Sequence, residues 1–147
     1  KEVDMVVNIG RVLEGDWTYV GDDIASVAAA AKQSGAITTV IFETGLLPND
    51  DIKRKLCELS EAAGAAFVKT STGFGFVKDA SGNLVSTGAT VEDITLMRAT
   101  CSPAVQVKAS GGIRSYEDAI RMVEAGATRL GTSATEAIAK GASGDSY

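Results

Sequence analysis

Apolar, β-branched segments alternate along this chain with alanine-rich or amphipathic segments, and each such pair recurs roughly every thirty residues. The strand-type segments are expected at residues 3–8, 37–42, 65–69, 104–108 and 128–130. The helix-type segments are expected at residues 22–34, 48–63, 91–100, 115–125 and 134–140. Such alternation builds βαβ units around a parallel sheet, and no linker interrupts it, so we expect a single α/β domain over residues 1–147.

One stretch departs from the alternation, and the two ends of the chain have features of their own. Residues 74–88 carry the pattern of a small β-hairpin with its turn at residues 79–83, and we expect this hairpin to leave the sheet as a loop excursion. Residues 1–8 already have the pattern of a core strand and no methionine precedes them, so we expect the chain to be part of something longer. Residues 141–147 are expected to form a loose tail.

Composition argues against several classes of function. Hydrophobic residues make up 45% and charged residues 22% of the chain, which is enough for a packed core. The net charge of -5 argues against general binding to nucleic acid or to a membrane surface, and no apolar run or leader points to insertion or secretion, so we expect a cytoplasmic protein. The chain has no histidine, and Cys57 and Cys101 lack metal-site spacing, so we expect no metal and two small core cysteines.

Polar residues within the strand segments help to distinguish an open sheet from a barrel. Side chains alternate between the two faces of a strand, so one face is expected to carry charged and amide groups from three strands. These residues are Asp4, Asn8, Lys69, Gln106 and Lys108. Helices cover both faces of an open parallel sheet, whereas a barrel interior near the carboxyl ends of its strands accommodates catalytic groups. The pattern therefore favours a parallel (β/α) barrel of the TIM type.

Lys69 is the candidate nucleophile. It ends an apolar strand segment and precedes a hydroxyl-rich turn, Thr-Ser-Thr-Gly, that ends at Gly73. Burial disfavours an ammonium ion and favours the neutral amine, which can attack a carbonyl carbon to form a Schiff base. The alternative is a lysine whose stem packs inside while its charged head reaches solvent.

Lys108 and Asp4 add to this hypothesis. Lys108 is expected at the end of the strand next to that of Lys69, and two ammonium ions in a confined site repel each other, so one of them loses its proton more readily. Asp4, on the same face, could move protons or pair with the remaining cation. A purely structural ion pair between Asp4 and either lysine is the alternative.

Two glycine-containing turns predict an anion site. Ser110, Gly111 and Gly112 follow one strand segment, and the turn from Gly131 through Thr132 to Ser133 follows the next. Each turn precedes a helix and can direct backbone N–H groups toward an anion. Paired phosphate-binding loops after the last two strands recur in barrel enzymes, so we expect a phosphate site here.

Six segments together resemble the deoxyribose-phosphate aldolase family. They are residues 2–10, 41–47, 67–75, 88–98, 107–114 and 130–133, and they extend over nearly the whole chain. The most specific are Val-Lys-Thr-Ser-Thr-Gly at residues 68–73 and Val-Lys-Ala-Ser-Gly-Gly at residues 107–112.

The resemblance implies a class I aldolase on an eight-stranded α/β barrel, with neither metal nor organic cofactor. By this likeness Lys69 would form the Schiff base, Lys108 would perturb it, and Asp4 would join a water-assisted proton relay. The reaction would cleave 2-deoxy-D-ribose 5-phosphate to D-glyceraldehyde 3-phosphate and acetaldehyde. The phosphate would be held by six residues, Thr72, Gly73, Gly111, Gly112, Gly131 and Ser133.

The chain also departs from the family pattern. It resembles only the fourth to eighth β/α units, so an incomplete barrel would expose two sheet edges and an apolar face. We therefore expect a homo-oligomer or a complementing N-terminal part of the barrel as a partner. Ala134 stands where some members have a second serine, Phe74 stands where some have a lysine, and the hairpin at residues 74–88 is longer than in compact members.

Two alternatives stay open at this point. One is a Schiff-base aldolase that acts on another phosphorylated sugar. The other is an inactive, truncated barrel fragment in which the lysines are present but not organised.

Overall fold

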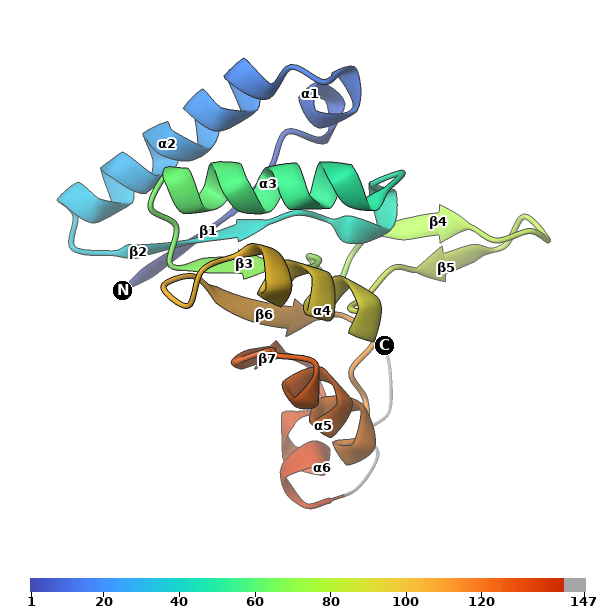
Figure 1. The fold of residues 1–147 in the computed structure, drawn as a ribbon. Helices are drawn as coiled ribbons and strands as arrows, with labels where there is room; N and C mark the ends of the chain where they lie inside the picture. The colour runs from blue at the N-terminus through green and yellow to red at the C-terminus, as the bar shows by residue number, and fades with distance from the viewer. Residues whose placement is uncertain (142–147) are drawn as a thin grey trace.

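The computed structural model describes residues 1–141, and its centre is a five-stranded parallel sheet (Figure 1). The strands are β1 (Glu2–Val6), β2 (Ile37–Ile41), β3 (Phe67–Lys69), β6 (Gln106–Ser110) and β7 (Arg129–Gly131). Each pairs in parallel with the next one along the chain, in the order β1-β2-β3-β6-β7.

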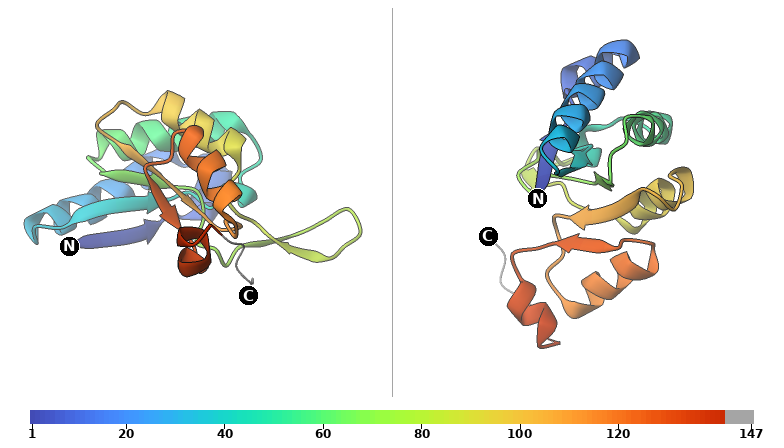
Figure 2. Two further views of the ribbon diagram at one scale, coloured as in Figure 1. Left: turned by 90° about the horizontal axis from the view of Figure 1, so that it is seen from below. Right: turned by 90° about the vertical axis from the view of Figure 1, so that its left-hand side faces the viewer.

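The main helices lie on one side of this sheet. They are α2 (Trp17–Gln33), α3 (Asp50–Ala62), α4 (Val91–Thr100) and α5 (Tyr116–Glu124). Seen along the sheet, the strands form an arc with these helices outside it (Figure 2). A doubly wound sheet would have helices on both faces. Sequential strand order with one covered face is instead the arrangement of a partial (β/α) barrel, which confirms the expected fold class.

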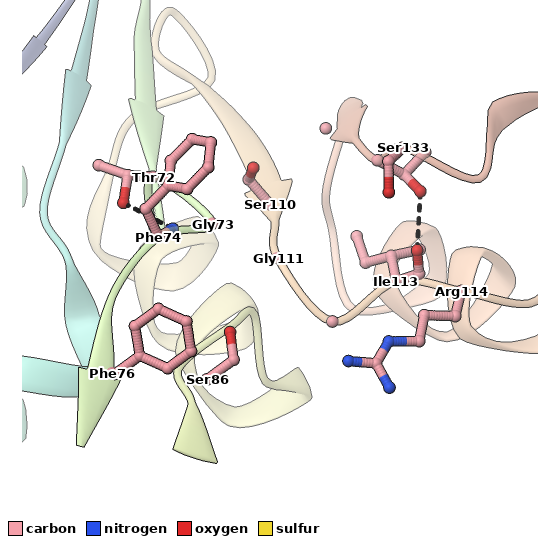
Figure 3. A pocket seen from close by; sticks show the side chains of 13 residues that line it. Thr72, Gly73, Phe74, Phe76, Ser86, Ser110, Gly111, Ile113, Arg114 and Ser133 are labelled. Atoms are coloured by element: carbon pink, nitrogen blue, oxygen red, sulfur yellow. Dashed lines mark hydrogen bonds between the residues drawn. The ribbon is translucent and has the colours of Figure 1, made fainter. Parts of the chain in front are cut away.

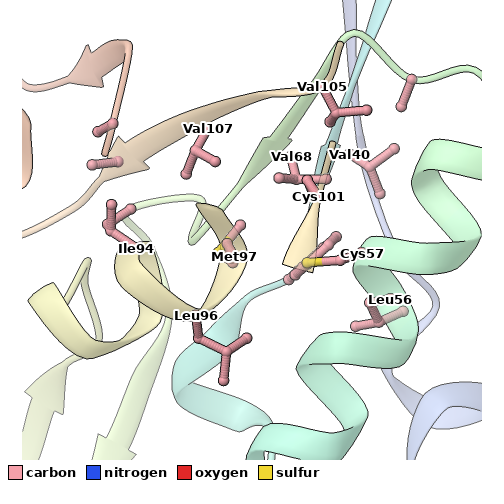
Figure 4. Close-up of a cluster of buried hydrophobic side chains, with 14 of the residues drawn as sticks. Val40, Leu56, Cys57, Val68, Ile94, Leu96, Met97, Cys101, Val105 and Val107 are labelled. Carbon is pink, nitrogen blue, oxygen red and sulfur yellow. The ribbon is translucent and has the colours of Figure 1, made fainter. Parts of the chain in front are cut away.

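The core fills the space between the sheet and the helices. Val40, Val68 and Val107 point outward from three neighbouring strands and are fully buried. Ile24, Leu56, Ile94 and Met97 pack against them from the helices, in the cluster drawn in part in Figure 4. Cys57 and Cys101 are free thiols buried in the same cluster, as expected.

The helical region after β1 differs from the prediction. A helix was expected from residue 22, but the structure has α1 (Ile9–Glu14) followed by α2 from Trp17. The carboxylate of Asp16 caps α2 by accepting from the N–H of Tyr19. Glycine and two aspartates at residues 21–23 resemble a helix start, but the hydrophobic packing of Val20 and Ile24 continues through them.

Two strand boundaries also differ. Asn8 was expected on the polar face of the first strand, but β1 ends at Val6 and the Asn8 side chain caps α1 by accepting from the N–H of Arg11. The strand expected at residues 104–108 is β6, two residues later, so Lys108 lies in its middle and Ser110 at its end. The pattern of residues 1–8 predicted a core strand, but most residues of β1 are exposed.

The predicted hairpin is present. β4 (Phe76–Lys78) and β5 (Leu84–Ser86) are antiparallel, and the Asp79 side chain accepts hydrogen bonds from the N–H groups of Ser81 and Asn83 in the turn. The hairpin projects from the carboxyl end of the sheet (Figure 2).

The remaining described segments are short. They are the 3-10 turn η1 (Thr44–Leu46) after β2 and the helix α6 (Thr135–Ala139) after β7. Within residues 1–141, no helix combines the length and the apolar character needed to cross a bilayer. The expected loose tail falls almost entirely on residues 142–147, outside the described residues.

A partly buried ion pair joins α3 to α4. The Nζ atom of Lys53 lies 2.7 Å from Oδ1 of Asp93 and 3.2 Å from Oδ1 of Asp50. Burial alone would lower the pKa of Lys53, but Asp93 and then Asp50 raise it above 10.5. This contribution to stability is therefore fully present below pH 10.5 and is lost as the pH rises through the folded-state pKa.

Replacing Lys53 by methionine should destabilise the fold. Lys53→Met leaves the Asp93 carboxylate almost buried without its cation, and we expect the free energy of unfolding in urea at pH 7 to fall by about 2–3 kcal/mol. Above pH 10.5 the difference in the free energy of unfolding between the variant and the unmodified protein should become smaller. Lys55→Met is the matched control, since Lys55 pairs with Glu58 on the exposed side of the same helix. Equal losses in the two variants would refute the role of the pair.

Candidate active site

One carboxylate oxygen joins the two lysines that the sequence singled out. Oδ2 of Asp4 lies 3.4 Å from Nζ of Lys69 and 3.2 Å from Nζ of Lys108. All three side chains point to the concave face of the sheet, the face that α2 to α5 leave open. Because both nitrogen atoms contact the same oxygen atom, the two lysines share one small site.

The strand register explains this meeting. Lys69 and Lys108 are paired residues of β3 and β6, so their side chains leave the sheet side by side. Asp4 reaches them from β1 across the concave surface, past β2, which contributes Thr39 and Ile41 to this face. Both of those residues are buried and uncharged, so no other charge of β2 competes for the carboxylate.

The site is sheltered from solvent to different extents. The side chains of Lys69 and Lys108 are 11% and 16% exposed, whereas that of Asp4 is 33% exposed. Burial alone would raise the pKa of Asp4, but hydrogen bonds and charge from Lys108 and then Lys69 lower it below 3.8. The carboxylate is therefore ionised at neutral pH and can balance one of two adjacent ammonium groups. An amine that gives up its proton here has both a carboxylate and a second amine beside it.

A cleft of about 720 Å³ opens where the strands end (Figure 3). Its wall is formed by the loops after β3, β6 and β7 and by one side of the hairpin. The lining residues are Thr72, Gly73, Phe74, Phe76, Ser86, Ser110, Gly111, Gly112, Ile113, Arg114, Gly131, Thr132 and Ser133. Neither lysine lines the cleft, because Lys69 and Lys108 lie two to three residues earlier on strands whose ends form its wall.

All six residues expected to hold phosphate lie around this cleft. Thr72 and Gly73 come from the loop after β3, and the glycines of residues 111–112 come from the loop after β6. Gly131 at the end of β7 and Ser133 in the loop after it also line the cleft. Thr132 joins the two loops by donating from Oγ1 to the carbonyl of Ile113, at 2.7 Å.

Sequence reasoning missed the hairpin side of the cleft and the cation at its rim. Phe74, Phe76 and Ser86 line the cleft from the hairpin, which was expected to be only an excursion. Arg114 brings a guanidinium to the opposite rim. Arg114 lay within the family-like segment at residues 107–114, and its position two residues after Gly112 was the signal that could have marked it.

Buried hydroxyl groups lock the loops after β3 and β6 together. Oγ1 of Thr70 donates to the carbonyl of Ser110 at 3.1 Å and accepts from its N–H, and Oγ of Ser71 donates to the same carbonyl. Gly88, at the exit of the hairpin, packs directly against the backbone of the turn at residues 111–112. A methyl group there would come within 2.5 Å of the carbonyl oxygen of Gly111.

Glu43 fixes the loop after β3 through hydrogen bonds to Thr72. Its carboxylate is buried, and Oε2 accepts from the N–H of Thr72 at 3.2 Å and from its hydroxyl at 2.5 Å. Glu43 has φ 56°, the only positive φ of a non-glycine residue in the part of the chain that the structure describes. Left-handed backbone costs energy for such a residue, so the position of this carboxylate is strongly constrained by its surroundings.

The fold and the site together define a class. A sequentially ordered parallel sheet covered on one face, with two lysines and a carboxylate on the other face, places the chain among the (β/α) barrel proteins of the TIM type. Two solved structures with the same fold are the aldolase QR15, with a TM-score of 0.79 and 35% identity, and the tetrameric deoxyribose phosphate aldolase of Aeropyrum pernix, with a TM-score of 0.77 and 32% identity. The likeness covers 95% of this chain and 57% and 53% of theirs.

Curated relatives narrow the class. The chain is 50% identical over 141 residues to the deoxyribose-phosphate aldolase of Thermococcus kodakarensis and 53% identical over 146 residues to that of Streptococcus sanguinis. These matches cover 96% and 98% of the chain but only 58% and 60% of the relatives. No protein-family model matches the chain. The chain is homologous to the deoxyribose-phosphate aldolases over nearly its whole length and spans about three fifths of the length of these relatives.

Proposed function

We propose that the chain carries the active site of a class I aldolase that cleaves 2-deoxy-D-ribose 5-phosphate to D-glyceraldehyde 3-phosphate and acetaldehyde. The observation that carries the proposal is the contact of Lys69 and Lys108 with a single oxygen atom of Asp4 on the sheltered concave face. The identity to deoxyribose-phosphate aldolases over nearly the whole chain supports this choice of substrate.

Lys69 is assigned the covalent step. Its neutral amine attacks the aldehyde carbon C1 of the open-chain sugar, and loss of water gives an iminium ion. The hydroxyl at C3 then loses its proton, the C2–C3 bond breaks, and the electron pair moves toward the iminium nitrogen. Glyceraldehyde 3-phosphate leaves, and protonation and hydrolysis of the remaining enamine release acetaldehyde and restore the amine.

Asp4 is assigned proton transfer, and Lys108 is assigned the electrostatic effect on Lys69. Asp4 lies within 3.4 Å of both amines, so it can take up and return protons at the Lys69 nitrogen or through a water molecule beside it. Lys108 keeps a positive charge next to Lys69, which disfavours a second ammonium ion there and supports the free amine.

The cleft beyond the strand ends is assigned to the phosphate group. The loops at residues 72–73, 111–112 and 131–133 line it, and glycine-containing loops after the last strands bind phosphate in other barrels. The Arg114 guanidinium at the rim adds positive charge. The aromatic rings of Phe74 and Phe76 make the hairpin side of the cleft apolar.

Borohydride trapping tests the proposal. The purified protein is incubated with acetaldehyde and a mild reductant, and addition of one ethyl group is expected. An adduct with dihydroxyacetone phosphate but not with acetaldehyde would indicate an aldolase for another phosphorylated sugar. No adduct with either compound would leave the inactive fragment as the better explanation.

Self-association also remains a prediction, and the tetrameric relative supports it.

A methyl group on Gly88 should damage the phosphate subsite selectively. Gly88→Ala would push the Gly111 backbone, because the new methyl group comes within 2.5 Å of the Gly111 oxygen and 3.0 Å of the Gly112 nitrogen. We expect the KM for deoxyribose 5-phosphate to rise about tenfold, while trapping of acetaldehyde, which has no phosphate, changes little.

Gly21→Ala is the matched control for this prediction. It also adds one methyl group, but its nearest neighbour is the end of the Leu59 side chain at 3.4 Å, far from the cleft in helix α2. Equal effects of Gly88→Ala on the phosphorylated and the unphosphorylated compound would contradict the assignment of the Gly111 loop to phosphate.

A further inference from the structure

A second charged contact crosses the concave face near the amines. Nη1 of Arg129, on the last strand of the sheet, lies 2.6 Å from both carboxylate oxygens of Glu2, on the first. Two further groups steady this pair. Oγ1 of Thr39 donates to Oε1 of Glu2 at 2.7 Å, and the Arg129 guanidinium lies 3.8 Å from the centre of the Phe67 ring.

The two members of this pair stand at different positions relative to the amine site. Glu2 precedes Asp4 by two residues in β1, so both carboxylates point to the same face, about 7 Å apart along the strand. Arg129 is the paired residue of Lys108 in the neighbouring strand. The charged groups that the sheet strands place on this face are Glu2, Asp4, Lys69, Lys108 and Arg129.

The five groups sort into two separate sets. Arg129 contacts only Glu2 among the acidic groups of the described residues, and the two lysines contact only Asp4. The pKa of Glu2 is lowered, first by the hydrogen bond from Thr39 and then by Arg129, although burial and the nearby charge of Asp4 oppose this. Glu2 is therefore ionised and neutralises the guanidinium at neutral pH.

A guanidinium released from Glu2 would compete strongly for Asp4. Its planar fork binds a carboxylate through two parallel hydrogen bonds, whereas an ammonium group acts as a point charge. Its head already reaches β1, and Asp4 is the next residue of β1 on this face. A carboxylate bound by a guanidinium accepts a proton less readily, and both lysines would lose their shared partner.

We propose that Glu2 is a positioning residue that holds Arg129 away from Asp4 and so keeps Asp4 available to Lys69 and Lys108. This inference rests on the proposed Schiff-base function. It assigns to the cluster formed by Glu2, Thr39, Phe67 and Arg129 a role in the chemistry, rather than only in joining the first strand of the sheet to the last. It further implies that the damage caused by losing Glu2 comes from Arg129.

That implication gives a suppression test. Glu2→Gln keeps the size and the hydrogen bond from Thr39 but removes the charge that holds the guanidinium. We expect the rate of acetaldehyde trapping to fall about tenfold, as for other coupled charges, and its pH profile to change. Adding Arg129→Leu, which retains an apolar contact to the Phe67 ring, should restore most of the rate and the original profile.

The outcomes separate this inference from the proposed function. Absence of an adduct in the unmodified protein would refute the proposed function itself. A normal adduct in that protein together with an unchanged rate in Glu2→Gln, or a double variant no faster than Glu2→Gln, would overturn only the positioning role. A merely structural pair predicts that the second substitution brings no recovery.

A second variant covers a possible failure of Glu2→Gln to fold, which circular dichroism would reveal. Thr39→Val removes only the hydroxyl that steadies Glu2, at 2.7 Å, and nearly preserves the shape of the side chain. We expect a smaller loss of trapping rate, again relieved by Arg129→Leu. A loss that Arg129→Leu does not relieve would overturn the proposal. Glu14→Gln, which breaks an exposed pair with Arg11 in α1, is the matched control and should change nothing.

Discussion

Replacement of Lys69 by alanine should abolish trapping of acetaldehyde and lower cleavage of deoxyribose 5-phosphate by at least about a thousandfold. The proposed function places the covalent bond on this nitrogen, and the remaining lysine of the site cannot take over without moving from its own strand. The measurements are the intact mass after borohydride reduction and the steady-state rate of glyceraldehyde 3-phosphate release.

Lys78→Ala is the matched control for this prediction. Lys78 is exposed in the hairpin, so its loss removes one surface amine without affecting the concave face. Persistence of a stoichiometric adduct in Lys69→Ala, with circular dichroism unchanged, would show that another amine is the nucleophile.

Lys108→Leu should move the pH dependence of acetaldehyde trapping to higher pH. In the intact site Asp4 is shared between two amines, 3.4 Å and 3.2 Å away. Without Lys108, the carboxylate pairs with Lys69 alone and the second cation no longer opposes an ammonium ion there. The substitution removes charge repulsion from the site, so we expect trapping to need more alkaline solution.

The trapping rate of Lys108→Leu is best measured across the range from neutral to alkaline pH, beside that of the unmodified protein. Recovery of the full rate at high pH would separate a charge effect from a damaged site. An unchanged pH profile in the variant would mean that the two amines are not coupled, despite their common partner.

The alternation of strand and helix patterns in the sequence was enough to predict most of the fold. It was sufficient because each strand buries its outward residues, such as Val68 and Val107, beneath a helix with its own apolar stripe. It failed at α1 and at the start of α2, where capping decides the boundary. A helix that begins at Asp16 or at Asp22 has nearly the same local pattern, and tertiary packing of Val20 selects the longer one.

The site could be predicted in part. Strand alternation placed Asp4, Lys69 and Lys108 on one face, and the structure brings all three into contact. It could not give the sharing of one oxygen atom, which depends on the curvature of the sheet. The same curvature brings Glu2 of the first strand to Arg129 of the last, residues that are 127 positions apart and that no local pattern connects.

The buried carboxylate of Glu43 shows another limit of sequence reasoning. Its residue type after an apolar strand was visible, but its left-handed backbone and its bonds to Thr72 arise only when the loop after β3 folds over it. Together with Thr70 and Ser71, Glu43 fixes the loop between the amine site and the cleft. The rigid part of the proposed phosphate subsite is thus built from side chains that do not line the cleft.

Peptide mapping of the unmodified protein after acetaldehyde and reductant tests the central claim most directly. An ethylated lysine resists trypsin, so the account predicts a single ethyl group on a peptide that runs uncut from Leu56 through Lys69 to Lys78. Ethyl groups found on Lys108, or scattered over exposed lysines with Lys69 unmodified, would contradict it.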